Sequence, residues 1–224
     1  MTDEDSIQNK QDWVAIPLHE DVPSLDPDAQ YFTNDREGWH CKNYHMLAKN
    51  PEGRIRHSYL KVGVEPCDQE RCERLQDEHK TLRDRLGEIV PSAVFIHTQI
   101  SEDGTVGALV ITQPVDISID VCDTAQCDHL RRMMKDNNHL LPELQHFLDG
   151  IEGWEAEGKI LDLSGEENLV VTDDGHLRYI DSFEVFLDPS QQRQAAYVQA
   201  SKERAAFLRD LLGQVDGSTQ QRDY

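Results

Sequence analysis

The sequence has few basic residues, few cysteines and no long apolar run. Its 224 residues include 22 Lys and Arg against 43 Asp and Glu, which gives a formal net charge of −21 at pH 7. Nucleic acids and anionic lipid surfaces are polyanions, so we expect neither nucleic acid nor a membrane surface as a partner. No stretch approaches the roughly 18 consecutive apolar residues of a membrane span, so we also expect no membrane insertion.

Two further absences concern the cellular compartment. The opening residues, MTDEDSIQNKQDW, lack the basic segment followed by an apolar segment that marks a secretory signal. Five cysteines are an odd number and too few to form a disulfide framework in a chain of this length. We therefore expect a protein of the reducing cytoplasm. The length predicts one domain, or two small lobes that share a cleft.

Hydrophobic periodicity and turn residues predict a mixed order of strands and helices. Apolar residues at helical spacing from Leu141 to Trp154 indicate a long helix, and the turn Asp173-Asp174-Gly175 indicates a hairpin. The expected elements are three strands within 29–64, a helix over 66–87, strands over 93–100 and 107–115, helices over 124–136 and 140–157, short strands within 159–163 and 168–183, and a helix over 189–213.

The most informative stretch is 158–183, GKILDLSGEENLVVTDDGHLRYIDSF. Asn168 and Asp181 lie 13 residues apart, at the two ends of the expected hairpin. An amide oxygen and a carboxylate at these positions converge on a hard divalent cation such as Mg²⁺, which prefers oxygen ligands. The stretch resembles the catalytic core of the protein-kinase-like superfamily, whose pattern is G-I-x-H-R-D-L-x-x-x-N, a hairpin and then D-F-G. The resemblance implies Asn168 and Asp181 as the metal ligands.

The first half of the chain follows the order of the same family. The family places a Lys on the third strand and a Glu on the following helix, and their pairing holds the Lys against the α- and β-phosphates of ATP. The strand at 107–115 resembles the hinge between the lobes, whose backbone meets the adenine. The residues that the resemblance assigns to ATP are Lys61, Glu78, Thr112, Gln113, Val115 and, in the loop that covers the phosphates, Gly38.

The catalytic carboxylate is the first departure from the family pattern. A gapless match places Leu163 where the catalytic Asp belongs, with Asp162 one residue early. Either a bulge after Asp162 returns its carboxylate to the cleft, or the position is vacant, because a slip of one residue in an extended segment turns a side chain to the other face. We favour the bulge, since Ser164-Gly165 can absorb an extra residue. Glu166 and Glu167 are reserve carboxylates in this loop.

Other departures affect the phosphate loop and the end of the chain. The glycine-rich loop is reduced to Gly38, with Arg36 and Lys42 as further phosphate partners. The D-F-G motif reads Asp181-Ser182-Phe183, which keeps the metal ligand and loses the switch glycine. The room after Asp181 fits one long helix, so we expect a truncated second lobe without a peptide-docking platform.

Two cysteine pairs share the spacing Cys-Asp-x3-Cys: Cys67 with Cys72, and Cys122 with Cys127. Four thiolates suggest zinc, but this spacing is at the long edge of the usual range. The expected fold also places the two pairs in different lobes. We therefore favour ordinary buried or capping thiols over a zinc site.

These observations together predict an α+β, protein-kinase-like two-lobed fold. Its expected parts are a flexible acidic arm over 1–28, a small lobe with an antiparallel sheet and one helix over 29–115, a truncated and mainly helical lobe over 116–215, and a disordered tail over 216–224. The expected function is transfer of the γ-phosphoryl group of Mg²⁺-bound ATP to a hydroxyl of a protein or small molecule, with Asp162 and Lys61 as catalytic residues. The alternative is a catalytically inactive pseudokinase that binds nucleotide or another protein.

Overall fold

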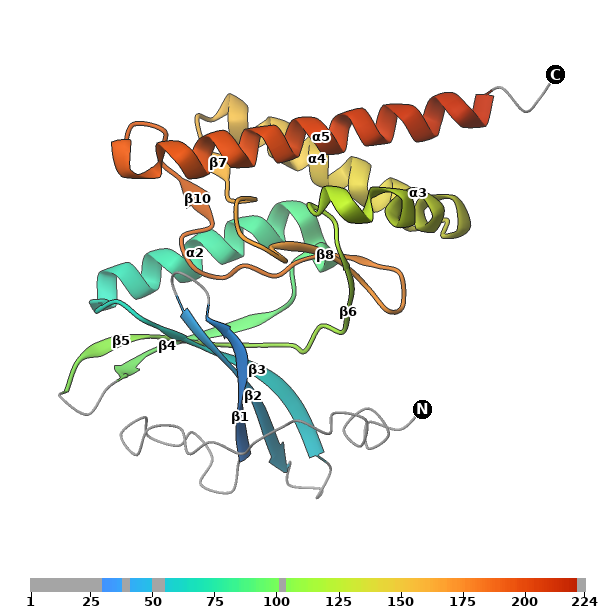
Figure 1. Ribbon diagram of the computed structural model, residues 1–224. Coiled ribbons are helices and arrows are strands. Elements are labelled where there is room, and N and C mark those ends of the chain that lie inside the picture. Colours follow the sequence, from blue (N-terminus) through green and yellow to red (C-terminus); the bar gives the residue numbers. More distant parts are fainter. Residues whose placement is uncertain (1–29, 38–40, 50–54, 101–103, 221–224) are drawn as a thin grey trace. The chain divides into compact units, whose positions relative to one another are not determined.

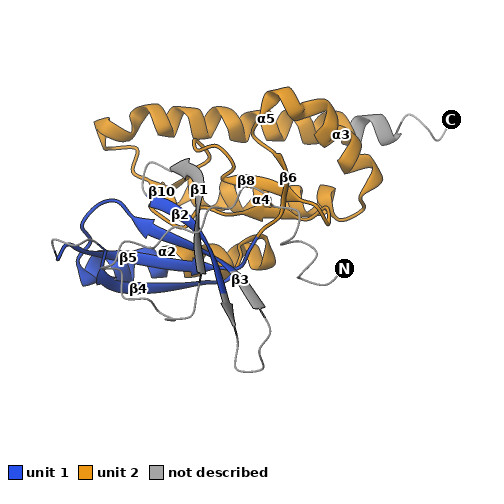
Figure 2. Cartoon of the chain, turned by 60° about the horizontal axis from the view of Figure 1, so that its bottom comes forward, with its two compact units in different colours: residues 1–77, 92–114 blue, residues 78–91, 115–224 orange. Residues whose placement is uncertain are grey.

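The computed structural model describes residues 30–37, 41–49, 55–100 and 104–220, and its fold class is α+β. The chain divides into two compact units (Figure 2). Unit 1 holds the described residues up to Asp77 together with Ser92–Pro114, and unit 2 holds Glu78–Pro91 together with the described residues from Val115 onward. One boundary therefore lies in the segment expected to be the hinge, and another lies inside a helix.

Unit 1 is built on one antiparallel sheet of five strands in the order β1-β2-β3-β5-β4 (Figure 1). Its strands are β1 (Gln30–Glu37), β2 (Cys41–Lys49), β3 (Ile55–Gly63), β4 (Ala93–Gln99) and β5 (Val106–Thr112). Side chains alternate between the two faces of a strand. Leu60 and Val62 of β3 are buried against Leu109 of β5, so Lys61 between them belongs to the opposite face.

Helix α2 (Gln69–Leu86) connects β3 to β4 and contains the boundary between the units. Asp68 accepts the backbone N–H of Arg71 at 2.8 Å, which caps the start of this helix. Leu82 and Leu86, one turn apart near its end, are buried in the core of unit 2. The short 3₁₀ turn η1 (Gly87–Ile89) ends the helix, and Gly87 adopts a φ of 59° that favours glycine.

Unit 2 combines the α-helices α3, α4 and α5 with short strands and two short 3₁₀ turns, η2 and η3. In chain order, its described elements after the end of α2 and η1 are β6 (Ile117–Asp120), η2 (Thr124–Gln126), α3 (Cys127–Asp136), α4 (Leu140–Ala156), β7 (Ile160–Leu161), β8 (Leu169–Thr172), β9 (Leu177–Tyr179), β10 (Phe186–Leu187), η3 (Gln192–Gln194) and α5 (Ala195–Gln220). The strands form two antiparallel sheets, β6-β8-β9 and β10-β7. Helices α4 and α5 lie side by side (Figure 1), and Arg209 of α5 is paired with Glu155 of α4 at 3.0 Å.

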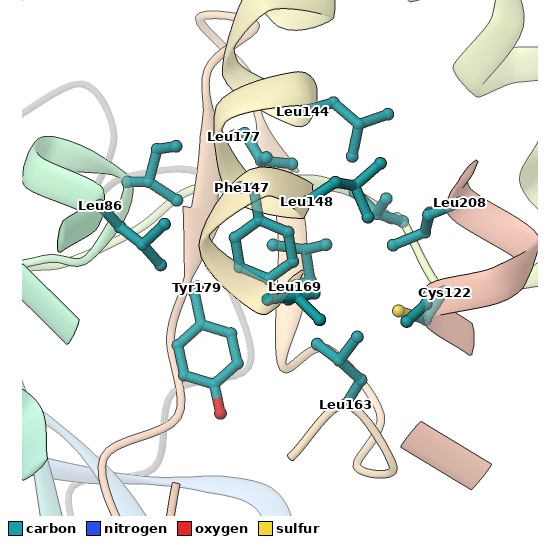
Figure 3. Packing of buried hydrophobic residues seen from close by; sticks show 14 of the residues in the cluster. Leu86, Cys122, Leu144, Phe147, Leu148, Leu163, Leu169, Leu177, Tyr179 and Leu208 are labelled. Carbon is teal, nitrogen blue, oxygen red and sulfur yellow. The ribbon is translucent and has the colours of Figure 1, made fainter. Parts of the chain in front are cut away.

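The core of unit 2 lies between the helices and the β8-β9 hairpin (Figure 3). Phe147 and Leu148 of α4 pack with Leu169 of β8 and Leu208 of α5. Tyr179 is fully buried, and its hydroxyl points away from the apolar cluster (Figure 3). Burial of so many large apolar side chains supplies the main stabilisation of this unit.

The structure confirms the order of the expected helices and corrects some of their bounds. The last helix continues to Gln220, so residues 216–220, which we expected in a disordered tail, are helical. The apolar stripe of α5 extends through Leu208, Leu212 and Val215, all buried, whereas the predicted helix ended at residue 213. Strands β6 and β10 were not expected. The arm over 1–28 and the turn at 50–53 lie outside the described residues. In the part of the chain that the structure describes, no helix has both the length and the apolar character needed to cross a membrane.

Candidate functional site

The candidate site of unit 2 begins at the open end of the β8-β9 hairpin. The hairpin turns at Gly175, whose φ of 84° requires glycine, and Leu169 pairs with Tyr179 at its other end. Just beyond, the Ile180 N–H donates to the Asn168 carbonyl at 2.9 Å. This ladder brings the side chains of Asn168 and Asp181 together, with Nδ2 of the amide 3.4 Å from Oδ2 of the carboxylate.

The amide of Asn168 is fixed in orientation by two neighbours. Its Nδ2 donates to the main-chain carbonyl of Asp162 at 3.1 Å. Gly165 packs against the amide so closely that a Cβ at that position would lie 2.6 Å from Oδ1. Because Nδ2 is held by the protein, Oδ1 is the atom of this side chain that is suited to bind a cation.

The carboxylate of Asp181 is anchored by the backbone that follows it. Its Oδ1 accepts the N–H groups of Ser182 at 2.7 Å and Phe183 at 3.2 Å. Ser182 and Phe183 are buried, and Glu184 after them adopts a left-handed φ of 49°, which is uncommon for a residue other than glycine. The carboxylate is therefore held with one oxygen on the backbone and the other directed to Asn168.

Asp162 and Leu163 point in different directions. Leu163 is 1% exposed and belongs to the core of unit 2, where it faces Leu169 (Figure 3). Asp162 follows strand β7, and its N–H donates to the Val185 carbonyl at 2.8 Å. Leu163 is thus a packing residue, and Asp162 supplies the buried carboxylate of this loop.

The Asp162 carboxylate is itself held in place. Its Oδ1 accepts the Ser164 N–H at 2.7 Å and the Ser164 hydroxyl at 2.6 Å. The Ser201 hydroxyl of α5 lies 3.4 Å from the same oxygen. The first two bonds close a turn in which the aspartate side chain caps the backbone two residues on. Among the described residues no hydrogen bond reaches Oδ2, so that oxygen is the one suited to accept a proton.

The phenol of Tyr179 is buried within electrostatic reach of three carboxylates. Its hydroxyl donates to the main-chain carbonyl of Asp162 at 2.9 Å. Burial raises the pKa of Tyr179 well above its usual range, and the charges of Asp181, Asp162 and, more weakly, Glu78 raise it further. Glu78 of α2 therefore lies within electrostatic reach of the same phenol as the two aspartates. This concentration of negative charge in unit 2 is an environment that a divalent cation would stabilise.

The reserve carboxylates have different surroundings. Glu166 is exposed. Glu167 adopts a left-handed φ of 59°, and its N–H donates to Oδ2 of Asp120 at 3.0 Å. The other oxygen of Asp120 accepts the Cys122 N–H at 2.9 Å. Asp120 thereby stabilises the uncommon backbone geometry next to Asn168, a contribution that no sequence pattern indicated.

Of the residues assigned to ATP, Lys61 and Thr112 lie on the sheet of unit 1. Lys61 pairs with Asn43 on one side and with Val110 on the other, in the middle of the sheet. Thr112 ends β5, and the Gln113 N–H donates to the Ser92 carbonyl at 3.4 Å. Val115 is the buried first residue of the next segment of unit 2, and Lys42 is exposed on β2. Gly38 and the side chain of Arg36 lie outside the described residues.

The two cysteine pairs fall in different units. Cys67 and Cys72 belong to unit 1, and Cys122 and Cys127 belong to unit 2. All are free thiols. Burial raises the pKa of Cys67 and of Cys72, and it raises the pKa of Cys122 to about 12, so these three thiols are neutral at physiological pH. Among the described residues, no group of three or more His, Cys, Asp or Glu is placed to hold a metal ion.

No protein-family model matches the chain, and no curated protein matches it as a relative. The function must therefore be inferred from the chemistry of the site itself.

The site of Asn168 and Asp181, with one amide oxygen and one carboxylate, offers too few protein ligands to enclose a cation alone. It suits Mg²⁺ that is also bound to water and to phosphate oxygens.

Proposed function

We propose that the chain is a kinase-like protein that binds Mg²⁺-ATP and transfers the γ-phosphoryl group to a hydroxyl. The proposal depends on one observation above the others: the Asn168 amide and the Asp181 carboxylate lie 3.4 Å apart at the base of one hairpin, each held in orientation by the backbone. This is the donor set expected for a magnesium ion that bridges protein and nucleotide phosphates.

The architecture of each unit supports the same proposal. Unit 1 is a five-stranded antiparallel sheet with α2 inserted between β3 and β4, and Lys61 lies on β3. Unit 2 is mainly helical, and its β8-β9 hairpin follows the Asp162 loop. This order of elements agrees with the order that the proposed kinase-like fold would have. The two-lobed arrangement itself is proposed.

In the proposed reaction the substrate hydroxyl oxygen attacks the γ-phosphorus of ATP. The bond from that phosphorus to the β–γ bridging oxygen breaks, and ADP leaves. Asp162 orients the attacking hydroxyl and accepts its proton on Oδ2. Lys61 would bind the α- and β-phosphates, with Glu78 as the partner that the family resemblance implies, and the backbone from Thr112 to Val115 would meet the adenine. Bound Mg²⁺ would neutralise charge on the phosphates, so positioning and electrostatics supply most of the rate.

One observation favours a second candidate, a pseudokinase that binds nucleotide without transferring phosphate. Oδ1 of Asp162 already accepts hydrogen bonds from Ser164 and lies near the Ser201 hydroxyl, so the carboxylate also has a structural role. A carboxylate that serves only to fix this loop and α5 would leave the site able to bind Mg²⁺-ATP but unable to act as a base.

A titration and an activity assay separate these functions. The melting temperature of the full chain is followed against Mg²⁺-ATP concentration, and ADP formation is measured with and without polyols and a serine-containing peptide as acceptors. A kinase shows saturable stabilisation and turnover that Asp162→Asn abolishes while stabilisation persists. A pseudokinase shows stabilisation without turnover. The absence of any Mg²⁺-dependent stabilisation by ATP would refute both.

A further inference from the structure

The loop from Asp162 to Asn168 is bound to helix α5 by the side chain of Ser201. The Ser201 Oγ accepts the Leu163 N–H at 3.0 Å and approaches Oδ1 of Asp162 at 3.4 Å. Ser201 is buried, and a buried polar group is stable only when it is hydrogen-bonded. The hydroxyl therefore fixes the backbone at the position where the chain passes from the buried aspartate to the core leucine.

Arg204 binds the same loop at two more points. Its Nη1 donates to the carbonyl of Leu163 and, at 2.6 Å, to the carbonyl of Gly165. The guanidinium is always protonated, so these are charge-assisted hydrogen bonds, which are stronger than neutral ones. They join backbone groups that are two residues apart and so set the curvature of the loop.

Two residues of the loop that α5 contacts, Gly165 and Asp162, also orient Asn168. Gly165, whose carbonyl accepts from Arg204, packs directly against the Asn168 amide. Asp162, whose side chain meets Ser201, also provides the main-chain carbonyl that accepts from Nδ2 of Asn168. A shift of either residue would move Asn168, although neither Ser201 nor Arg204 is close to it in the sequence.

Ser201 and Arg204 are three residues apart and therefore share a face of α5. Arg209, further along the helix, pairs with Glu152 and Glu155 of α4 and makes none of these loop contacts. The same helix thus carries one arginine that binds the loop and another that joins two helices.

We propose that Ser201 and Arg204 are positioning residues that hold the Asp162–Asn168 loop in the geometry in which Asn168 binds a divalent cation. The proposal rests on the proposed function of Asn168 and Asp181. Ser201 and Arg204 do not touch the cation themselves. Both act through the backbone of Leu163 and Gly165. Groups that orient a metal ligand in this way change metal affinity by roughly 10- to 100-fold when they are removed.

The test measures the Mg²⁺ concentration that gives half-maximal stabilisation of the full chain by ATP. Arg204→Ala is compared with Arg209→Ala, which removes a guanidinium from the same helix without touching the loop. We expect Arg204→Ala to raise the half-maximal Mg²⁺ concentration by about 10-fold or more. Arg209→Ala should lower the melting temperature and leave that concentration unchanged. Equal Mg²⁺ dependence in the two variants would overturn the proposal.

Ser201 provides an independent test that does not require nucleotide. Hydrogen exchange at the Leu163 amide should become faster in Ser201→Ala and return toward the native rate in Ser201→Thr, which restores the hydroxyl. Unchanged exchange in Ser201→Ala would show that α5 does not hold the loop. If the unaltered chain is not stabilised by Mg²⁺-ATP, the positioning role is overturned together with the proposed function, even where exchange responds as expected. If the unaltered chain is stabilised but Arg204→Ala leaves the Mg²⁺ titration unchanged, the positioning role alone is overturned.

Discussion

Nδ2 of Asn168 lies 3.4 Å from Oδ2 of Asp181, and the same nitrogen donates to the Asp162 carbonyl. The amide nitrogen thus faces the protein, so Oδ1 and the carboxylate are the two groups of the pair that would bind the proposed cation. A cation bound there would be held by residues from both ends of one hairpin. Its affinity should therefore depend on the charge of Asp181 and on the orientation of Asn168.

The charge of Asp181 can be removed without changing its shape. Asp181→Asn should abolish Mg²⁺-dependent stabilisation by ATP, because a neutral amide binds a hard cation far more weakly than a carboxylate. Asp173→Asn is the matched control, since Asp173 is exposed in the turn of the same hairpin. Thermal-shift titration checks both variants. Retention of Mg²⁺ dependence in Asp181→Asn would exclude Asp181 as a ligand.

The orientation of Asn168 can be altered without touching its own atoms. Gly165→Ala would place a Cβ 2.6 Å from Oδ1, so the amide must move and Mg²⁺ affinity should fall, by about 10-fold. Gly213→Ala is the control. Gly213 lies within helix α5, and a Cβ added there would meet no other atom within 4 Å.

We expect Gly213→Ala to leave Mg²⁺ binding unchanged and to stabilise the fold by roughly 0.5–1 kcal/mol. A Gly165→Ala variant that binds Mg²⁺-ATP as well as the native chain would show that the close contact with Asn168 is not needed.

The packing role of Leu163 predicts a large effect on stability. Leu163→Ala should lower the free energy of unfolding by about 2–5 kcal/mol, since it leaves a cavity in the core of unit 2. Val94→Ala, at a side chain 59% exposed on β4, should change stability by no more than about 0.5 kcal/mol. Urea unfolding measures both. A small effect of Leu163→Ala would mean that its side chain is not buried.

Alkaline pH should destabilise the protein through Cys122. Burial, with a smaller contribution from the charge of Asp120, raises the pKa of this thiol from 9.0 to about 12 in the folded protein. The unfolded chain therefore loses this proton first, so the stability that the neutral thiol contributes is present below about pH 9 and falls by about 1.4 kcal/mol for each pH unit up to about pH 12.

Urea unfolding from about pH 8 to about pH 11 checks this prediction. Cys122→Ala should show a shallower loss of stability with rising pH than the native chain. Identical slopes in the native chain and Cys122→Ala would contradict the burial of this group.

The sequence was sufficient for those features that depend on local spacing. The β8-β9 hairpin and the long helix α4 follow from the turn around Gly175 and from helical periodicity, and the structure confirms both. Strands β6 and β10 have only four and two residues and pair with distant partners, so local patterning could not indicate them. Neither the ATP contacts nor the catalytic role of Asp162 is tested by the fold, and both stay predictions.

The supports of the candidate site could not be predicted in the same way. Ser201 and Arg204 lie 38 and 39 residues from Leu163 and Gly165, their loop partners, and Asp120 lies 47 residues from Glu167. A serine or arginine on a helix is usually exposed to solvent, and only the packing of α5 against the loop gives these two residues a specific partner. Tertiary contacts of this kind leave no periodic signal in the sequence.

Paramagnetic broadening by Mn²⁺ in the presence of ATP tests the central claim most directly. Mn²⁺ accepts the same oxygen ligands as Mg²⁺ and broadens the NMR signals of nearby nuclei. In the native chain, the signals of Asn168 and Asp181 should broaden first, at the lowest Mn²⁺ concentrations, and the broadening should be lost in Asp181→Asn. Broadening spread over the exposed acidic residues, or centred away from the β8-β9 hairpin, would contradict a cation site formed by Asn168 and Asp181.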